Sequence, residues 1–166
     1  VVINTCTVTN TSDKKSRNII RQAVKNNDGA IIVVMGCYSQ VRSEDIKGID
    51  GVNIIIGNTN KSKVVELVED YIKNRENKIL VENIMHTDFE PMVLDSFETK
   101  TRSFVKIQDG CNNYCSYCII PYTRGNVRSK KKENVISEIK ALVKNGYKEV
   151  VLTGIHTGHY GQDLKE

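Results

Sequence analysis

Short apolar runs and helix-like apolar stripes alternate along the first half of this chain. The apolar runs occupy residues 1–5, 30–35 and 52–56. Around them, apolar residues recur three or four positions apart, as in residues 19–24 and 64–72. Alternation of buried strands with amphipathic helices favours a parallel sheet that is connected by helical crossovers. We therefore predict an α/β fold for this half.

Local signals indicate where these helices begin and end. Thr11, Ser12 and Asp13 are residue types that cap helices, so they are expected to start the first helix. Residues 26–29 read Asn-Asn-Asp-Gly and favour its end. A further short helix is expected near residues 43–49.

The second half begins a new strand–helix–strand pattern. Residues 103–108 alternate as a strand does, residues 135–143 carry a helical stripe, and residues 149–153 form the next apolar run. Gly146 stops the helix. In β/α barrels the catalytic loops follow the C-terminal ends of such strands.

A stretch of mixed composition separates the two halves. Residues 76–100 lack clear periodicity, although residues 79–81 could form a strand. We expect a domain over residues 1–75, a connector over residues 76–100 with His86 on its surface, and a second domain over residues 101–166.

Three of the five cysteines, Cys111, Cys115 and Cys118, lie within eight residues at C-x3-C-x2-C spacing. Three thiolates on one compact loop can ligate three irons of a [4Fe–4S] cluster and leave the fourth iron open. Structural zinc usually takes four ligands in paired C-x2-C units, and this loop has one such pair. The next imidazoles, on His156 and His159, lie beyond a predicted helix and strand. Zinc, a disulfide and unliganded thiols stay open as alternatives.

The other two cysteines each follow a predicted strand. Cys6 and Cys37 come just after the first and second apolar runs. Parallel strands deliver their C-terminal ends to one edge of a sheet, where ligands bind in open α/β folds. The two thiols are therefore expected on the same edge, as metal ligands or as buried small apolar residues. Gly57 and Asn58 end the third run there, and Gly57 either admits a close partner or forms an ordinary turn.

Composition places few restrictions on the partners of this chain. It has 166 residues, is 39% hydrophobic and 27% charged, and has a net charge of +4, which does not by itself demand a nucleic-acid partner. The longest apolar run is far too short to cross a bilayer, so no membrane is expected. An odd number of cysteines with a cluster motif favours a reducing cytoplasm.

Two further segments permit opposing interpretations. The basic run at residues 128–132 precedes a helix, where lysines oppose the helix dipole. It either meets an anionic partner such as RNA or is a solvated charge run. Residues 154–161 place glycines at G-x3-G-x2-G spacing, which is not a dinucleotide-binding fingerprint.

The cysteine motif, with Tyr117 just before its last cysteine, resembles the radical S-adenosylmethionine (SAM) superfamily signature. Its extension over residues 118–125, Cys-Ile-Ile-Pro-Tyr-Thr-Arg-Gly, resembles the methylthiotransferases, and Asn4-Thr5-Cys6 and Gly36-Cys37 are similar to their N-terminal domain. The resemblance implies a Rossmann-like domain followed by the first part of a partial TIM barrel. It also implies a chain truncated at both ends and inactive in isolation.

The same resemblance implies the cofactors and the residues that hold them. Cys111, Cys115 and Cys118 would ligate the radical SAM cluster, and SAM would be cleaved by one electron to a 5′-deoxyadenosyl radical. Tyr117 would lie near the SAM adenine, and Thr153 and Gly154 would contact the cofactor. Cys6 and Cys37 would hold a second, auxiliary [4Fe–4S] cluster whose third ligand lies upstream of Val1.

The implied activity is transfer of a methylthio group to tRNA. Residues 152–161 look like the branch that modifies N6-threonylcarbamoyladenosine next to the anticodon, at carbon 2. Branches that act on isopentenyladenosine in tRNA or on a ribosomal protein aspartate are the alternatives. The expected partners are tRNA, SAM and an electron donor. A non-enzymatic metal-binding RNA module, which would bind zinc and no SAM, is the alternative from another class.

Overall fold

A computed structural model describes residues 1–90 and 101–164 of the chain. The elements of the first half are β1 (Val2–Thr5), α1 (Asn10–Asn26), β2 (Val33–Gly36), α2 (Cys37–Val41), α3 (Ser43–Lys47), β3 (Ile54–Ile56), η1 (Lys61–Lys63), α4 (Val64–Asn74), β4 (Lys78–Leu80) and η2 (Ile84–His86). The second half contains β5 (Arg102–Lys106), β6 (Gln108–Asp109), α5 (Ile120–Arg124), β7 (Arg128–Ser129), α6 (Lys132–Lys144), β8 (Glu149–Thr153) and η3 (Thr157–His159).

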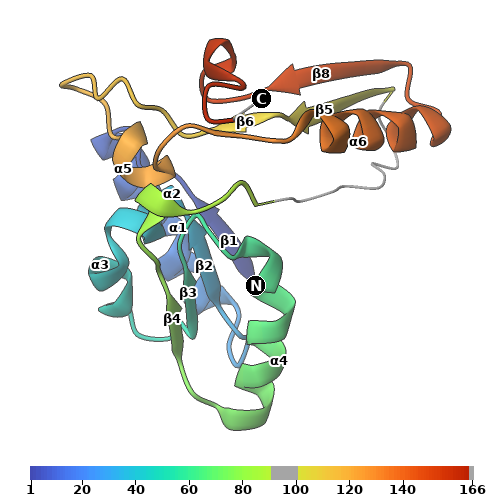
Figure 1. The fold of residues 1–166 in the computed structure, drawn as a ribbon. Helices are drawn as coiled ribbons and strands as arrows, with labels where there is room; N and C mark the ends of the chain where they lie inside the picture. The colour runs from blue at the N-terminus through green and yellow to red at the C-terminus, as the bar shows by residue number, and fades with distance from the viewer. Residues whose placement is uncertain (91–100, 165–166) are drawn as a thin grey trace.

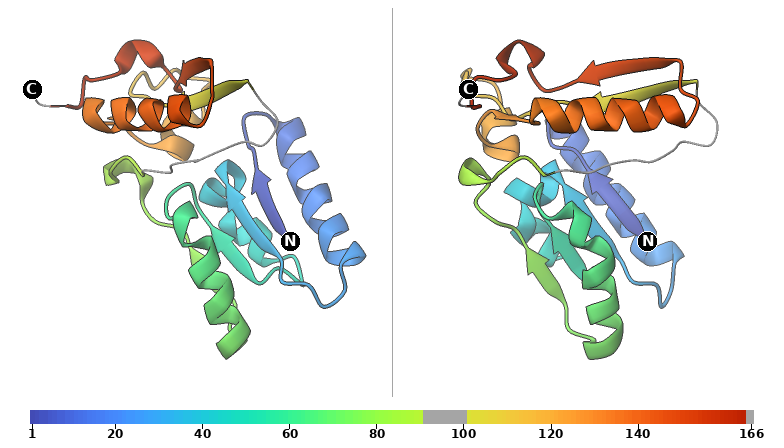
Figure 2. Two further views of the ribbon diagram at one scale, coloured as in Figure 1. Left: turned by 90° about the vertical axis from the view of Figure 1, so that its right-hand side faces the viewer. Right: turned by 45° about the vertical axis from the view of Figure 1, so that its right-hand side comes forward.

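The first half is a parallel sheet with helices on both faces (Figure 1). Its strand order is β1-β2-β3-β4, and every neighbouring pair is parallel. Helices α1 and α3 cover one face, where Ile20 and Ile46 are completely buried. Helix α4 covers the other face through Val64, Leu67, Val68 and Tyr71 (Figure 2). This confirms the predicted Rossmann-like domain.

Some local boundaries differ from the sequence prediction. The N-cap of α1 is Thr9, whose hydroxyl accepts a hydrogen bond from the Ser12 amide, so the helix starts before the predicted cap. Helix α2 was not predicted because five residues are too few to show a helical period. Strand β4 pairs with β3, so the first sheet extends beyond residue 75 into the stretch predicted to be a connector. Residues 91–100 of that predicted connector lie outside the described residues.

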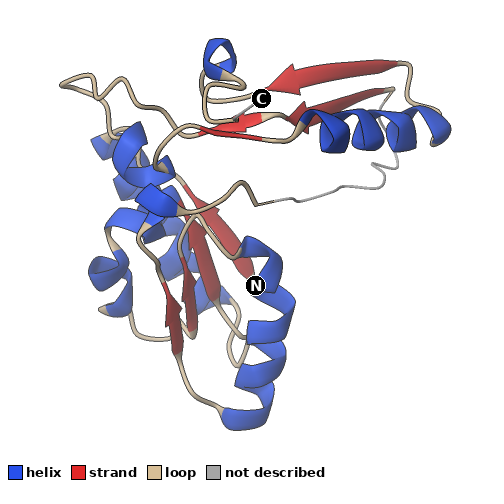
Figure 3. Ribbon diagram, viewed as in Figure 1, coloured by secondary structure: helices blue, strands red, loops and turns tan. Residues whose placement is uncertain are grey.

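The second half contains one βαβ unit. Strands β5 and β8 are parallel neighbours, and α6 packs on one face of the pair through Val135 and Leu142 (Figure 3). Strands β6 and β7 form a short antiparallel ribbon between β5 and α6. This agrees with the predicted opening of a radical SAM barrel.

Candidate functional site

Three neighbouring strands of the first sheet deliver polar residues to one edge. In the β1–β2 register Thr5 pairs with Gly36, so the next residues are Cys6 and Cys37. Met35 pairs with Ile56 in the next register, which brings the turn at Asn58 to the same edge. We call Cys6, Cys37 and Asn58 the sheet rim. The prediction that both cysteines lie on one edge is confirmed, with Cys37 buried and Cys6 exposed.

The third strand end is packed closely. A Cβ on Gly57 would lie 2.3 Å from Oε1 of Gln40, so a larger residue there would have to displace the Gln40 side chain. The same Gln40 oxygen accepts a hydrogen bond of 2.8 Å from the Asn58 amide. Of the two interpretations of Gly57, the structure supports the close partner, and that partner is the Gln40 side chain.

The three clustered cysteines lie on a loop that a β-ribbon closes. We call residues 110–119 the cysteine loop. Strands β6 and β7 pair on either side of the segment that contains it, and the Cys111 amide donates to the Gly125 carbonyl at 3.0 Å. Gly110 has φ +74°, and a Cβ there would lie 1.9 Å from the Asn126 carbonyl oxygen. The base of the loop is therefore fixed by backbone packing, which only glycine permits at this position.

The donors on the cysteine loop suit a cluster held by three thiolates. All five cysteines are free thiols, and Cys111 is buried while Cys115 is exposed. Within residues 1–90 and 101–164, no three Cys, His, Asp or Glu side chains converge in a geometry that holds a metal ion. The identity and spacing of the loop thiols fit an iron–sulfur cluster with one open iron. Ligation requires their side chains to turn toward one another.

No histidine joins the cysteine loop to complete a zinc site in the described part of the chain. His156 and His159 instead stack on each other, with ring centroids 3.9 Å apart. His86 is exposed, as predicted. In the described ranges, none of these histidines lies with the loop thiols as a fourth zinc ligand.

Asn58 connects the sheet rim with the segment after the cysteine loop. Its Nδ2 lies 3.3 Å from the Cys37 sulfur and 2.6 Å from the carbonyl oxygen of Thr123 in α5. Helix α5 begins two residues after Cys118, and Figure 1 shows it beside α2, which begins at Cys37. The segment after the cysteine loop therefore packs against the sheet rim. Sequence reasoning assigned no such role to Asn58, because its partner Thr123 lies 65 residues away.

Gln108 connects the cysteine loop with the segment after β8. Its side chain is completely buried, and Nε2 donates to the carbonyls of Asp109 and Gly110 at 2.8 Å each. Its Oε1 accepts a hydrogen bond from the His156 amide at 2.8 Å, and Gly154 lies against it. The predicted cofactor contact at Gly154 is therefore held beside the base of the cysteine loop. Gln108 was missed in the sequence because it reads as one more strand residue.

The other predicted cofactor contacts are placed differently. Thr153 ends β8, and its hydroxyl lies 3.4 Å from the Val105 carbonyl oxygen. Tyr117 is 90% exposed on the cysteine loop. An aromatic ring so open to solvent is available to stack on a ligand, and its role stays a prediction.

Asp109 collects three cationic groups at the base of the cysteine loop. Its Oδ2 lies 2.9 Å from Lys106 Nζ, 3.6 Å from Arg124 and 4.0 Å from Arg128. Burial by itself would raise the pKa of Asp109, but the positive charges of Lys106, Arg124 and Arg128 and the hydrogen bond from Lys106 together hold the pKa below its ordinary 3.8. The carboxylate therefore stays ionised and holds the two sides of the loop base together.

The basic run at residues 128–132 is mostly buried, which corrects the prediction. Arg128 donates to Thr87 and to the Arg124 carbonyl, and Lys130 forms an ion pair with Glu138 of α6. Only Lys131 and Lys132 are exposed. A solvated charge run does not describe Arg128 and Lys130, because both are buried beside a carboxylate of this chain.

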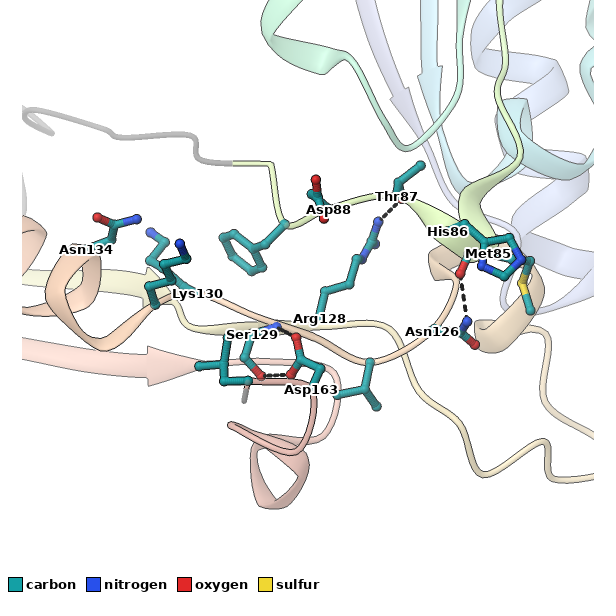
Figure 4. Close-up of a pocket in the computed structure, with 14 residues that line it drawn as sticks. Met85, His86, Thr87, Asp88, Asn126, Arg128, Ser129, Lys130, Asn134 and Asp163 are labelled. Carbon is teal, nitrogen blue, oxygen red and sulfur yellow. Dashed lines mark hydrogen bonds between the residues drawn. The ribbon is translucent and has the colours of Figure 1, made fainter. Parts of the chain in front are cut away.

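A groove of about 700 Å³ lies between the residues after η2 and the start of α6 (Figure 4). Arg128 reaches from β7 to Thr87, and Asn126 donates to the Met85 carbonyl at 2.7 Å. Ser129 donates hydrogen bonds to the Asp163 carboxylate from both its backbone amide and its hydroxyl. The contacts of Arg128 and Asn126 attach the segment around η2 to the second half of the chain.

Both halves of the chain match known protein families. Residues 1–57 match the Uncharacterized protein family UPF0004, and residues 105–164 match the Radical SAM superfamily. The second match includes the cysteine loop and β8. The predicted resemblance to radical SAM methylthiotransferases is confirmed by these matches and by the relatives below.

Relatives with assigned names are similar along nearly the whole chain. The Bacillus subtilis threonylcarbamoyladenosine tRNA methylthiotransferase is 48% identical over 99% of this chain, and the Aquifex aeolicus protein of the same name is 42% identical over 98%. A tRNA-2-methylthio-N(6)-dimethylallyladenosine synthase from Clostridium perfringens is 33% identical over 100%. The chain spans 37%, 40% and 38% of the length of these relatives.

No helix in the described ranges is long and apolar enough to pass through a bilayer.

Proposed function

We propose that this radical SAM methylthiotransferase, which is similar to the threonylcarbamoyladenosine branch, adds a methylthio group to tRNA. The target is carbon 2 of N6-threonylcarbamoyladenosine next to the anticodon. The observation that carries the proposal is the junction of a three-cysteine loop with a rim that holds two further cysteines.

The residues of this chain have separable tasks in that reaction. Cys111, Cys115 and Cys118 would hold the radical cluster, and Cys6 and Cys37 supply two thiols for an auxiliary cluster. When bound, the cluster and SAM supply the one-electron chemistry that can remove hydrogen from an aromatic C–H bond. Such a bond is too weakly acidic for proton abstraction near neutral pH, which is why this substrate class needs that chemistry.

The remaining site residues position these groups. Gln108 holds the loop base against Gly154, where we place the cofactor, and Tyr117 supplies an exposed ring for the adenine. Asn58 fixes the distance between the rim and α5 through its two contacts. Preorganisation of this kind matters because small displacements of reacting groups lower rates steeply.

The partners follow from the same proposal. They are tRNA, SAM and an electron donor, and tRNA as substrate places the protein in the cytoplasm. Similarity to the dimethylallyladenosine synthase keeps isopentenyl-type tRNA as a second candidate substrate. The relatives named above are called tRNA methylthiotransferases or a tRNA-modifying synthase, which favours tRNA over a ribosomal protein aspartate.

Two experiments test the proposal with the full-length protein. Single alanine variants of Cys111, Cys115 and Cys118 should each abolish reductive SAM cleavage, and the unaltered protein is the control. Nucleosides from a deletion strain should lack the methylthio form of threonylcarbamoyladenosine and keep the isopentenyl-type product. Loss of the isopentenyl-type product alone would contradict the substrate assignment, and SAM cleavage in all three variants would contradict the radical chemistry.

A further inference from the structure

A small cavity lies where the sheet rim meets the base of the cysteine loop. The residues that line it are Asn58, Lys61, Phe89, Glu90, Lys106, Asp109, Arg124 and Arg128. Its volume is about 80 Å³. One water needs roughly 10–15 Å³ of such space, so the cavity has room for a few waters or one small ion and not for a nucleoside. We call it the junction cavity.

The lining of the junction cavity has an excess of positive charge. Four of its side chains are cationic and two are carboxylates. Both carboxylates are already engaged. Oδ2 of Asp109 is shared among three of the cations, and Glu90 accepts hydrogen bonds from the amide and hydroxyl of Ser62 at 2.9 and 2.6 Å. The cations therefore repel one another with too few counter-charges.

Lys61 is the cation with the least compensation. Among residues 1–90 and 101–164, its side chain forms no ion pair and no hydrogen bond. Burial lowers the pKa of Lys61, and the positive charge of Arg124 lowers it further. A half-buried ammonium without a partner is unfavourable, and an anion beside it would remove the conflict.

Two guanidinium groups at the cavity also have unused donors. Nε of Arg124 and Nε of Arg128 are buried and donate to no acceptor in the described structure. The Arg128 side chain is 11% exposed, so bulk water cannot serve it freely. Buried donors without acceptors are rare in folded proteins because each forfeits its hydration. Both arginines flank the same space as Lys61.

We propose that the junction cavity binds one phosphate group between Lys61, Arg124 and Arg128. A tetrahedral oxyanion matches the fork of donors that arginine presents and accepts a further bond from an ammonium. Its charge offsets the excess in the lining. Because Asn58 also borders the cavity and contacts Cys37, the bound group lies at the junction between the rim and the cysteine loop.

Two sources carry this chemistry. One is a free phosphate ion, and the other is a single phosphate of an RNA backbone inserted from outside. The second source rests on the proposed function, and the first does not. Phosphate binding can be measured without SAM turnover, so failure of this inference and failure of the proposed activity are distinguishable.

The test is calorimetric titration of the anaerobic full-length protein with sodium phosphate at constant ionic strength. We expect saturable binding that weakens roughly 10- to 100-fold in Lys61→Gln, as removal of one charged hydrogen bond implies. Lys63→Gln is the matched control, because Lys63 is exposed in the same short helix and does not line the cavity. Equal affinity in the wild-type and Lys61→Gln proteins would mean an adventitious ion only. The absence of saturable binding would mean that the cavity holds no phosphate. Either result would overturn the proposal.

An anticodon stem-loop RNA distinguishes the two sources. If RNA displaces phosphate and Lys61→Gln weakens RNA binding as well, the cavity takes a backbone phosphate. If RNA binds without displacing phosphate, the site takes the free ion. Both outcomes require the Lys61-dependent phosphate site.

Discussion

Alanine replacements of Gly110 and Gly29 separate the conformational cost of a Cβ from the steric cost of close backbone packing. Gly110 lies at the base of the cysteine loop, and Gly29 lies elsewhere as a comparison. The two glycines have nearly the same backbone angle, with φ of +74° and +72°. A residue with a Cβ loses about 1–2 kcal/mol in this left-handed region. Their surroundings differ, since a Cβ on Gly29 meets nothing within 4 Å, whereas one on Gly110 meets the Asn126 carbonyl oxygen at 1.9 Å and the Gly125 carbonyl oxygen at 2.7 Å.

The expected magnitudes follow from those contacts. Gly29→Ala should lower the free energy of unfolding by about 1–2 kcal/mol, the conformational cost alone. Gly110→Ala adds a clash with backbone atoms, which cannot rotate away as a side chain can, and overpacking of this kind costs about 1–3 kcal/mol. The total loss at Gly110 is therefore about 2–5 kcal/mol.

Urea unfolding of the full-length variants, followed by far-ultraviolet circular dichroism, measures both losses. Because a protein of several units need not unfold in one step, amide hydrogen exchange should locate the effect. Exchange should rise over residues 110–127 in Gly110→Ala and stay unchanged there in Gly29→Ala. Equal losses in the two variants, with no local rise in exchange, would refute the idea that close backbone packing fixes the cysteine loop.

Three further predictions concern charged side chains. Lys130→Met and Glu138→Leu should each lower the free energy of unfolding by about 3–5 kcal/mol, because each leaves a buried charge unpaired, and the double variant should regain most of it; additive losses in urea unfolding would contradict this. In phosphate-free buffer Lys61→Gln should be more stable than the wild type, because the folded protein disfavours the charged lysine. Burial, followed by the positive charges of Arg124 and Lys106, lowers the pKa of Lys61 below 10.5, although Cys37 and Asp109 act in the opposite direction. That advantage should shrink as pH rises from the folded pKa toward 10.5, where the wild-type lysine loses its charge, and a pH-independent difference would count against it. Arg102→Ala should change stability by less than about 1 kcal/mol, because its 2.8 Å ion pair with Glu149 is exposed, and a larger loss would show that the pair stabilises the β5–β8 edge.

The strands and the cysteine positions were accessible from the sequence. Strand β1 and the rim position of Cys6 follow from short apolar runs that end at polar residues. The β5–α6–β8 unit was predicted for the same reason. Helical stripes were less reliable about burial, since Ile19, Ile136 and Val143 lie on predicted stripes and are exposed. Periodicity identifies the apolar face of a helix, but it does not show how much of that face the neighbouring element covers.

The functional junction needed the tertiary structure. Thr123 lies far from Asn58 in sequence, and no local pattern marks their contact. Gln108 resembles any strand residue until its three hydrogen bonds to loop and β8 segments are seen.

The α/β alternation, the common edge for Cys6 and Cys37, and the three-thiol loop could all be predicted, because each depends on residue types at short spacing. Which charges are buried is known only from the packing of the folded chain. Arg128 and Lys130 read as part of a basic surface run, yet they pair with Asp109 and Glu138 inside the protein. The environment of a charge depends on partners that packing brings together, and local sequence does not encode those distances.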